Sequence, residues 1–147
     1  MPLKIACLML CMFCLVSCSK QRDSIKDKVK ENKAYIWQQK GVEYFVQDKF
    51  EKAIECHNKA IDLMPTLTTA YYGKGEALFY LKQYGEAEQI FQKLIEIEPD
   101  NVDGWYMLSM VYLETRESMK AKKVFQKLDE LDPEVAEKML QLYTVLR

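Results

Sequence analysis

The stretch AYIWQQKGVEYFVQDKFEKAIECHNKAIDLMPTL, residues 34–67, decides the fold because its pattern is written twice more without a gap. When the chain is laid on itself at a period of 34 residues, similar residue types recur at Trp37, Tyr71 and Trp105; Gly41, Gly75 and Ser109; Ala53, Ala87 and Ala121; Ala60, Leu94 and Leu128; and Pro65, Pro99 and Pro133. A period of this length is typical of a solenoid built from helix pairs. The sequence therefore predicts an all-α fold.

These positions resemble the tetratricopeptide repeat, which has an aromatic residue early in its first helix, small residues at the helix crossings and a proline near its end. The resemblance covers residues 34–135 without insertions. It implies a right-handed α-solenoid with repeats at 34–67, 68–101 and 102–135. The departures from the pattern are Lys40 and Lys74 in place of Leu, His57 in place of an aromatic residue, and Ser118 where Phe50 and Tyr84 stand in the other repeats. At these positions we expect local packing to differ.

Short and helix-breaking residues predict where the helices meet and end. Gly75 and Ala87 lack bulk, so the two helices of a pair can approach closely there. The three repeated prolines disfavour helical geometry in the residue before them, so each second helix should stop at that point. Asn101 and Asp132 are candidate helix caps.

Residues 136–147 are predicted to form a helix that covers the last repeat, as terminal units of a solenoid require. Its apolar face is Val135, Met139, Leu142 and Leu146, flanked by Leu140 and Tyr143, and its polar face is Glu137, Lys138, Gln141 and Thr144. The alternative role for this segment is a tail that binds a partner.

Length and charge limit the function classes. A chain of 147 residues with 49% apolar content can bury one core. The net charge of −1 argues against a nucleic-acid partner. The charge is uneven, since the three repeats carry −1, −3 and −2, whereas residues 19–33 carry six basic and three acidic groups. An acidic solenoid therefore follows a basic segment, residues 19–33.

The amino terminus has the pattern of a secretory leader. Lys4 is the only charge in residues 1–17, and the apolar run of residues 5–16 is too short to cross a bilayer, which takes roughly 20 residues. The segment Leu15-Val16-Ser17-Cys18 resembles the lipobox of bacterial lipoproteins. The resemblance implies that residues 1–17 are a signal peptide, that Cys18 is lipidated, with palmitate among its chains, and that residues 18–33 form a charged tether to the membrane. In the lipoprotein family, a residue other than Asp after the cysteine, here Ser19, favours the outer membrane facing the periplasm over the inner membrane.

Two alternatives for the leader stay open. It can be an ordinary signal peptide, or a eukaryotic amino-terminal anchor palmitoylated on several cysteines, since Cys7, Cys11, Cys14 and Cys18 all fall in the first 18 residues. For the tether we expect a loose beginning that becomes helical near Ser24. The other readings of the tether are a flexible spacer and an extension of the first repeat helix.

The resemblance also implies a concave groove lined by the first helix of each pair. Carried onto this chain, the partner-binding residues are Tyr35, Gln38, Val42, Thr69, Tyr72, Glu76, Tyr80, Asp103, Tyr106 and Met110. The set is rich in tyrosine, which gives contact area with little loss of entropy. Phe45, Phe79 and Leu113 also fall on these helices, and they can instead pack as core. Some family members bind a carboxy-terminal carboxylate with cations. Here the corresponding positions are Gln38, Val42, Gly73, Asp103 and Met107, so no such clamp is expected.

Nothing in the sequence indicates catalysis, a cofactor or a metal site. Cys56 and His57 are neighbours on one helix and point about 100 degrees apart, so they are interpreted as packing residues in place of an aliphatic and an aromatic group. The chain is therefore predicted to be a non-enzymatic, membrane-anchored adaptor or scaffold that binds another protein or peptide in an assembly of the bacterial cell envelope. The alternative is a structural lipoprotein that associates with itself through the groove or the end helix.

Overall fold

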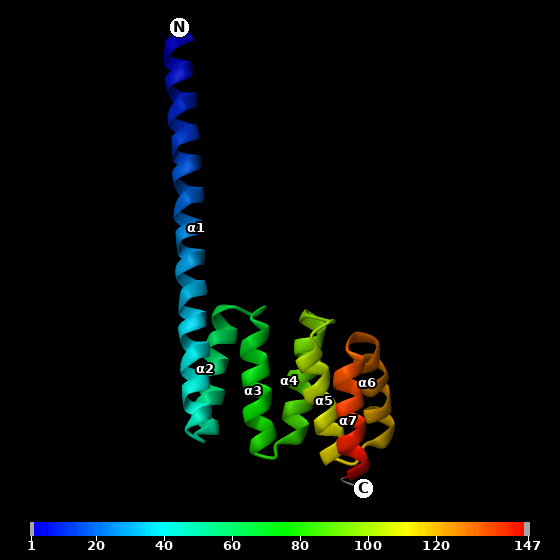
Figure 1. Ribbon diagram of the computed structural model, residues 1–147. Coiled ribbons are helices and arrows are strands. Elements are labelled where there is room, and N and C mark those ends of the chain that lie inside the picture. The colour runs from blue at the N-terminus through cyan, green and yellow to red at the C-terminus, as the bar shows by residue number, and fades with distance from the viewer. Residues whose placement is uncertain (1, 146–147) are drawn as a thin grey trace.

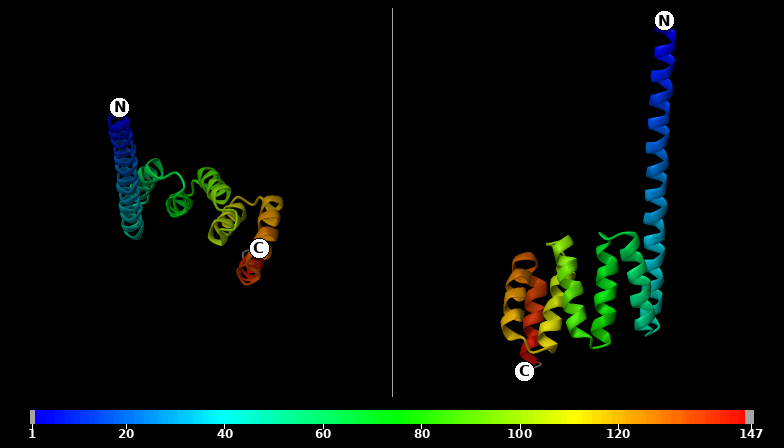
Figure 2. Two further views of the ribbon diagram at one scale, coloured as in Figure 1. Left: turned by 90° about the horizontal axis from the view of Figure 1, so that it is seen from above. Right: turned by 180° about the vertical axis from the view of Figure 1, so that it is seen from behind.

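The computed structural model describes the backbone of residues 2–145 and the side chains of Arg22 and residues 24–141. The described chain is all helix, with no strand: α1 Pro2–Val46, α2 Phe50–Leu63, α3 Thr68–Tyr80, α4 Tyr84–Ile97, α5 Val102–Glu114, α6 Ser118–Leu131 and α7 Pro133–Val145. Seen from above, α1, α3, α5 and α7 form one layer and α2, α4 and α6 form the other (Figure 1 and Figure 2, left). The predicted all-α solenoid of helix pairs is confirmed.

Helix ends recur at the period of the sequence. The second helices begin at Phe50, Tyr84 and Ser118, and each ends two residues before a repeated proline, as the prolines predicted. Both predicted caps are also present. The Asn101 Oδ1 accepts the Gly104 backbone N–H at 2.8 Å, and the Asp132 Oδ1 accepts the Val135 N–H at 3.1 Å. Local sequence signals therefore set where the second helices end and where α5 and α7 begin.

Aromatic residues early in the first helices tie each unit to the one before it. The Tyr71 hydroxyl donates to the Pro65 carbonyl at 3.0 Å, and the Trp105 Nε1–H donates to the Pro99 carbonyl at 2.7 Å. Each bond fixes the loop between two units against the following helix. The repeated spacing of six residues between proline and ring is thus explained by this hydrogen bond.

The core lies between the two layers and is built from the small and apolar repeat positions. Ala53, Ala87 and Phe91 are fully buried. A Cβ added to Gly75 would lie 2.6 Å from the Phe91 ring, so α3 and α4 approach as closely as the sequence predicted. The solenoid is held together by this close packing at every crossing.

Helix α1 differs from the predicted tether. Instead of a loose beginning that becomes helical near Ser24, one helix of 45 residues runs from Pro2 into the first repeat. The chain holds no Gly or Pro between Pro2 and Gly41, and Lys, Glu, Gln, Leu and Met are good helix formers, so nothing in this stretch interrupts the helix. The exposed residues 24–33 therefore form a projecting stalk (Figure 1).

Helix α7 packs its apolar side on the last pair. It begins at Pro133, three residues before the predicted start, because Asp132 caps it and proline suits the first turn of a helix. Ala136 and Met139 are buried, whereas Glu137, Lys138 and Gln141 are exposed. The side chains of Leu142, Tyr143 and Thr144, and all of Leu146, lie outside the described part of the chain.

Candidate peptide-binding face

The residues predicted to contact a partner lie on three neighbouring helices of one layer, and we call them the α1–α3–α5 face. Tyr35, Val42, Thr69, Tyr80 and Asp103 are exposed, and Gln38, Tyr72, Glu76, Tyr106 and Met110 are half-buried. None of the ten is fully buried. The two tyrosines at the centre, Tyr72 and Tyr106, pack their inner edges on the core while keeping part of their surface open to solvent.

The alternative for Phe45, Phe79 and Leu113, that they are ordinary core, holds only in part. All three are half-buried, and Phe79 and Leu113 pack against core clusters. The Phe45 ring lies 5.4 Å from both Phe50 and Tyr80, and Phe50 stacks on Tyr80 at 5.4 Å with the planes only 10° apart. Tyr80, although 57% exposed, is therefore held in place by two rings beneath it.

The centre of the face is acidic and partly desolvated. Burial, reinforced by Glu76 and then Asp103, raises the pKa of Tyr72 to about 12. Burial also raises the pKa of the Glu76 carboxyl above its ordinary value. Among the described side chains, no hydrogen bond or ion pair reaches the Glu76 carboxylate. A half-buried carboxylate without a partner destabilises the fold, and groups of this kind concentrate at functional sites.

The face combines exposed aromatic side chains with two carboxylates. Ordered aromatic groups supply contact area, and Glu76 and Asp103 can accept charged hydrogen bonds. Within the described residues, no group of three His, Cys, Asp or Glu side chains is arranged to hold a metal ion. The positions at which some tetratricopeptide-repeat proteins carry cations for a terminal carboxylate hold Gln38, Val42, Gly73, Asp103 and Met107 here. None of these residues is basic, so these positions suit a basic ligand better than an acidic one.

Comparison with known proteins identifies the repeated unit. Two tetratricopeptide-repeat family models match residues 34–67 and 78–145. The chain is built of tetratricopeptide repeats. A curated relative, RNA polymerase II-associated protein 3 of Rattus norvegicus, is 35% identical over 68 residues, which are 45% of this chain and 10% of the relative. The chain thus spans about a tenth of that protein.

Solved tetratricopeptide-repeat structures have the same fold. The first such domain of Spaghetti (RPAP3), bound to the HSP90 peptide SRMEEVD, superposes with a TM-score of 0.73 at 24% identity, covering 79% of this chain and 94% of that one. The yeast Sti1 TPR2B domain, in complex with an Hsp70 peptide, has a TM-score of 0.71 at 25% identity, covering 76% of this chain and 94% of that one. Tetratricopeptide repeats mediate protein–protein interaction in these neighbours.

In this tetratricopeptide-repeat protein, His57 and Cys56 are both buried inside the helix stack. A Cβ on either Gly41 or Gly73 would lie 2.5 Å from the His57 ring, so the imidazole fills the slot between α1 and α3. The pKa of His57 falls to about 4 because of burial, and burial raises the pKa of the Cys56 thiol. At neutral pH the imidazole is therefore uncharged and the thiol is protonated, as expected for side chains packed in a core.

The predicted lipidation site, Cys18, falls where the structure describes the backbone and not the side chain. Its backbone belongs to α1. Within the described part of the chain, no helix is both long enough and apolar enough to cross a bilayer.

Proposed function

We propose that this tetratricopeptide-repeat protein is a membrane-moored adaptor that binds a segment of another protein on the α1–α3–α5 face. The observation that carries the proposal is the unpaired, half-buried Glu76 carboxylate set among the partly exposed Tyr72, Tyr80 and Tyr106. Such a group destabilises the free protein, and a basic side chain from a partner would supply the missing charge.

The charge of the face also selects the class of partner. The HSP90 peptide bound by Spaghetti, SRMEEVD, carries three acidic residues and one basic residue. On this chain the corresponding face presents Glu76 and Asp103 and lacks the cations that an acidic tail needs. We therefore infer an extended or helical segment with apolar anchors and at least one Lys or Arg, and not an acidic chaperone tail.

For the mooring we propose lipidation of Cys18, which would place the protein in the bacterial cell envelope. The support is the charged start, the short apolar run and the small residue before the cysteine. Two or three acyl chains are needed for stable anchoring, and the basic residues that follow would add about 1 kcal/mol each beside an anionic bilayer. With α1 helical throughout, residues 18–34 would space the repeats roughly 24 Å from the anchor, at about 1.5 Å per residue.

Selection from a random peptide library against the purified protein tests the binding proposal. Enriched peptides should combine an apolar or aromatic anchor with Lys or Arg. Glu76→Gln should weaken their binding about tenfold, because a charged hydrogen bond is lost. The same change should raise stability at neutral pH, because the folded state no longer desolvates a carboxylate.

Tyr72→Ala with Tyr106→Ala should abolish capture while helical content by circular dichroism is unchanged. Lys93→Gln, at an exposed site on α4 in the other layer, is the matched control and should bind as the parent does. Enrichment of acidic peptides, or full binding by the double variant, would overturn the proposal.

A further inference from the structure

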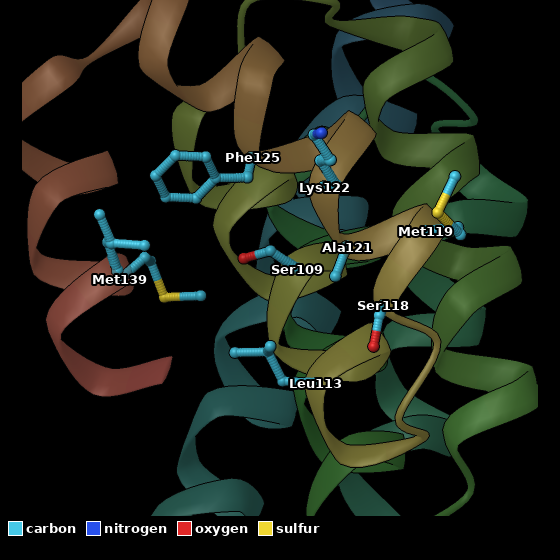
Figure 3. Close-up of a pocket in the computed structure, with 9 residues that line it drawn as sticks. Ser109, Leu113, Ser118, Met119, Ala121, Lys122, Phe125 and Met139 are labelled. Carbon is cyan, nitrogen blue, oxygen red and sulfur yellow. The ribbon is translucent and has the colours of Figure 1, made fainter. Parts of the chain in front are cut away.

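A cavity lies at the other end of the solenoid from the stalk. It has a volume of about 430 Å³ and opens between α5, α6 and α7. Figure 3 shows Leu113, Phe125 and Met139 around it, one from each of these helices. Met119, at its edge, is 75% exposed. None of the ten residues of the α1–α3–α5 face lines this cavity.

The internal repeat of the chain shows what this cavity lacks. In the first unit the Phe50 ring lies 5.4 Å from Phe45, and in the second the Tyr84 ring lies 5.4 Å from Phe79. The third unit has Ser118 at that position. Ser118 lines the cavity, and its short side chain cannot fill the volume that a ring fills in the first two units.

The partner residue is also smaller in the third unit. Leu113 stands where Phe45 and Phe79 stand in the first two, which widens the same space. Apart from Ser109 and Lys122, the remaining lining residues are apolar, Met139 and Phe125 among them (Figure 3). An aromatic side chain is therefore the group whose shape and polarity fit the cavity.

Charge at the rim adds a second requirement. Glu88 on α4 accepts the Tyr112 hydroxyl at 2.9 Å and pairs with Lys120 at 3.1 Å, and both of these donors come from the next unit. Lys122, 34 residues after Glu88, holds the same place on α6 with the opposite charge and lines the cavity. Among the described residues, no hydrogen bond or ion pair reaches Lys122. The occupant should therefore bring a carboxylate.

We propose that the α5–α6–α7 cavity binds one aromatic side chain of a partner polypeptide, with a neighbouring Asp or Glu of that partner paired to Lys122. The two surfaces then have opposite preferences, since the α1–α3–α5 face selects basic segments and this cavity selects an acidic one. Two different segments can bind at the same time, as an adaptor requires.

Methionine-methyl NMR on the full chain tests the proposal, with acetylated and amidated Glu-Phe-Glu as the probe. Saturable shifts are expected at the methyl groups of Met119 and Met139 and not at Met64, which packs in a different core cluster. Glu-Ala-Glu and Lys-Phe-Lys should bind at least about tenfold more weakly, because one lacks the ring and the other has the wrong charge.

Two variants separate the ring from the charge. Ser118→Phe rebuilds the filled position of the first two units, so it should keep the fold and remove binding. Lys122→Gln should weaken the binding of Glu-Phe-Glu several-fold and abolish the preference for Glu-Phe-Glu over Lys-Phe-Lys. Lys123→Gln, at an exposed neighbouring position, should change neither. Undiminished binding by Lys122→Gln or Ser118→Phe would overturn the proposal. So would shifts of Met119 and Met139 that depend on protein concentration without peptide, since a second copy would then be the occupant.

Discussion

The buried histidine gives a sharp test of the packing. His57 is the only histidine in the chain, it is fully buried, and neither ring nitrogen has a hydrogen-bond partner among the described residues. The repeat places Phe91 and Phe125 at the same position of the other two units. We therefore predict that His57→Phe keeps the fold and removes a pH dependence of stability that the parent has.

The magnitude follows from the pKa. Burial lowers the pKa of His57 to about 4 from its ordinary 6.5, so the unfolded chain takes up a proton that the folded chain resists. The stability is complete above pH 6.5 and is lost as pH falls toward 4. At about 1.36 kcal/mol per unit of pKa, the histidine should cost about 2 kcal/mol at pH 5 and about 3 kcal/mol at pH 4.

At pH 8 the substitution should change stability little, because two effects oppose each other. Removing two unpaired buried nitrogens gains about 1–3 kcal/mol, while the larger ring must fit between Gly41 and Gly73 at a cost of about 1–3 kcal/mol. The informative quantity is therefore the slope with pH and not the value at one pH.

Urea unfolding of parent and variant at pH 8, 6.5 and 5, followed by circular dichroism, measures this slope. Carboxyl groups titrate in both proteins, so the difference between the two isolates His57. The variant should gain about 2 kcal/mol on the parent between pH 8 and 5. A difference that stays constant over this range would show that the imidazole finds a partner or solvent, and the packing account would be refuted.

Three further predictions concern the close contacts, the turns and the anchor. Gly73→Ala should lower the free energy of unfolding by about 1–3 kcal/mol, because its Cβ would lie 2.5 Å from the His57 ring. Gly85→Ala, with nothing within 4 Å of the added Cβ, should stabilise the protein by up to about 1 kcal/mol. Equal effects of the two changes in urea titrations would contradict the close packing of His57 against Gly73. Lys82→Gly should raise the free energy of unfolding by about 0.5–1 kcal/mol, and with it the thermal midpoint, because Lys82 has a φ of 60°, which glycine adopts without strain. A lower midpoint would count against strain at this turn. Cys18→Ala should abolish labelling by radioactive palmitate and leave the leader uncleaved; unchanged labelling would assign the lipid to another cysteine.

The sequence predicted the repeated helix pairs because their signals are local. Pro65 and Pro99 mark where second helices end, and Asn101 caps the helix that follows. The turns inside each pair were not predicted. Asp48, Lys82 and Arg116 all have φ near +60°, a conformation that favours glycine, and none of them is glycine. At each turn, local backbone hydrogen bonds close the end of the first helix around this residue; in the second unit the Lys82 N–H donates to the Phe79 carbonyl and the Gln83 N–H to the Leu78 carbonyl, both at 2.9 Å.

For the candidate face and the cavity, too, the sequence singled out residues that are involved but not how neighbouring helices pack around them. The helical register placed Tyr72, Glu76 and Tyr106 on one face. It could not show that Glu76 has no hydrogen-bond or ion-pair partner among the described residues, since that depends on what neighbouring helices bring near it. Ser118 was visible as a departure from the repeat. That the departure leaves an open cavity, and not a collapsed one, depends on how α7 packs across it.

The most direct measurement of the central claim is site-specific photo-crosslinking in the native cell. A photoreactive phenylalanine analogue would replace Tyr106 on the α1–α3–α5 face, or Lys93 on α4 as the control. The account predicts an adduct with another polypeptide from position 106, lost when Glu76→Gln and Tyr72→Ala are added, and none from position 93. An adduct from position 93 alone, or one from position 106 that survives both substitutions, would contradict it.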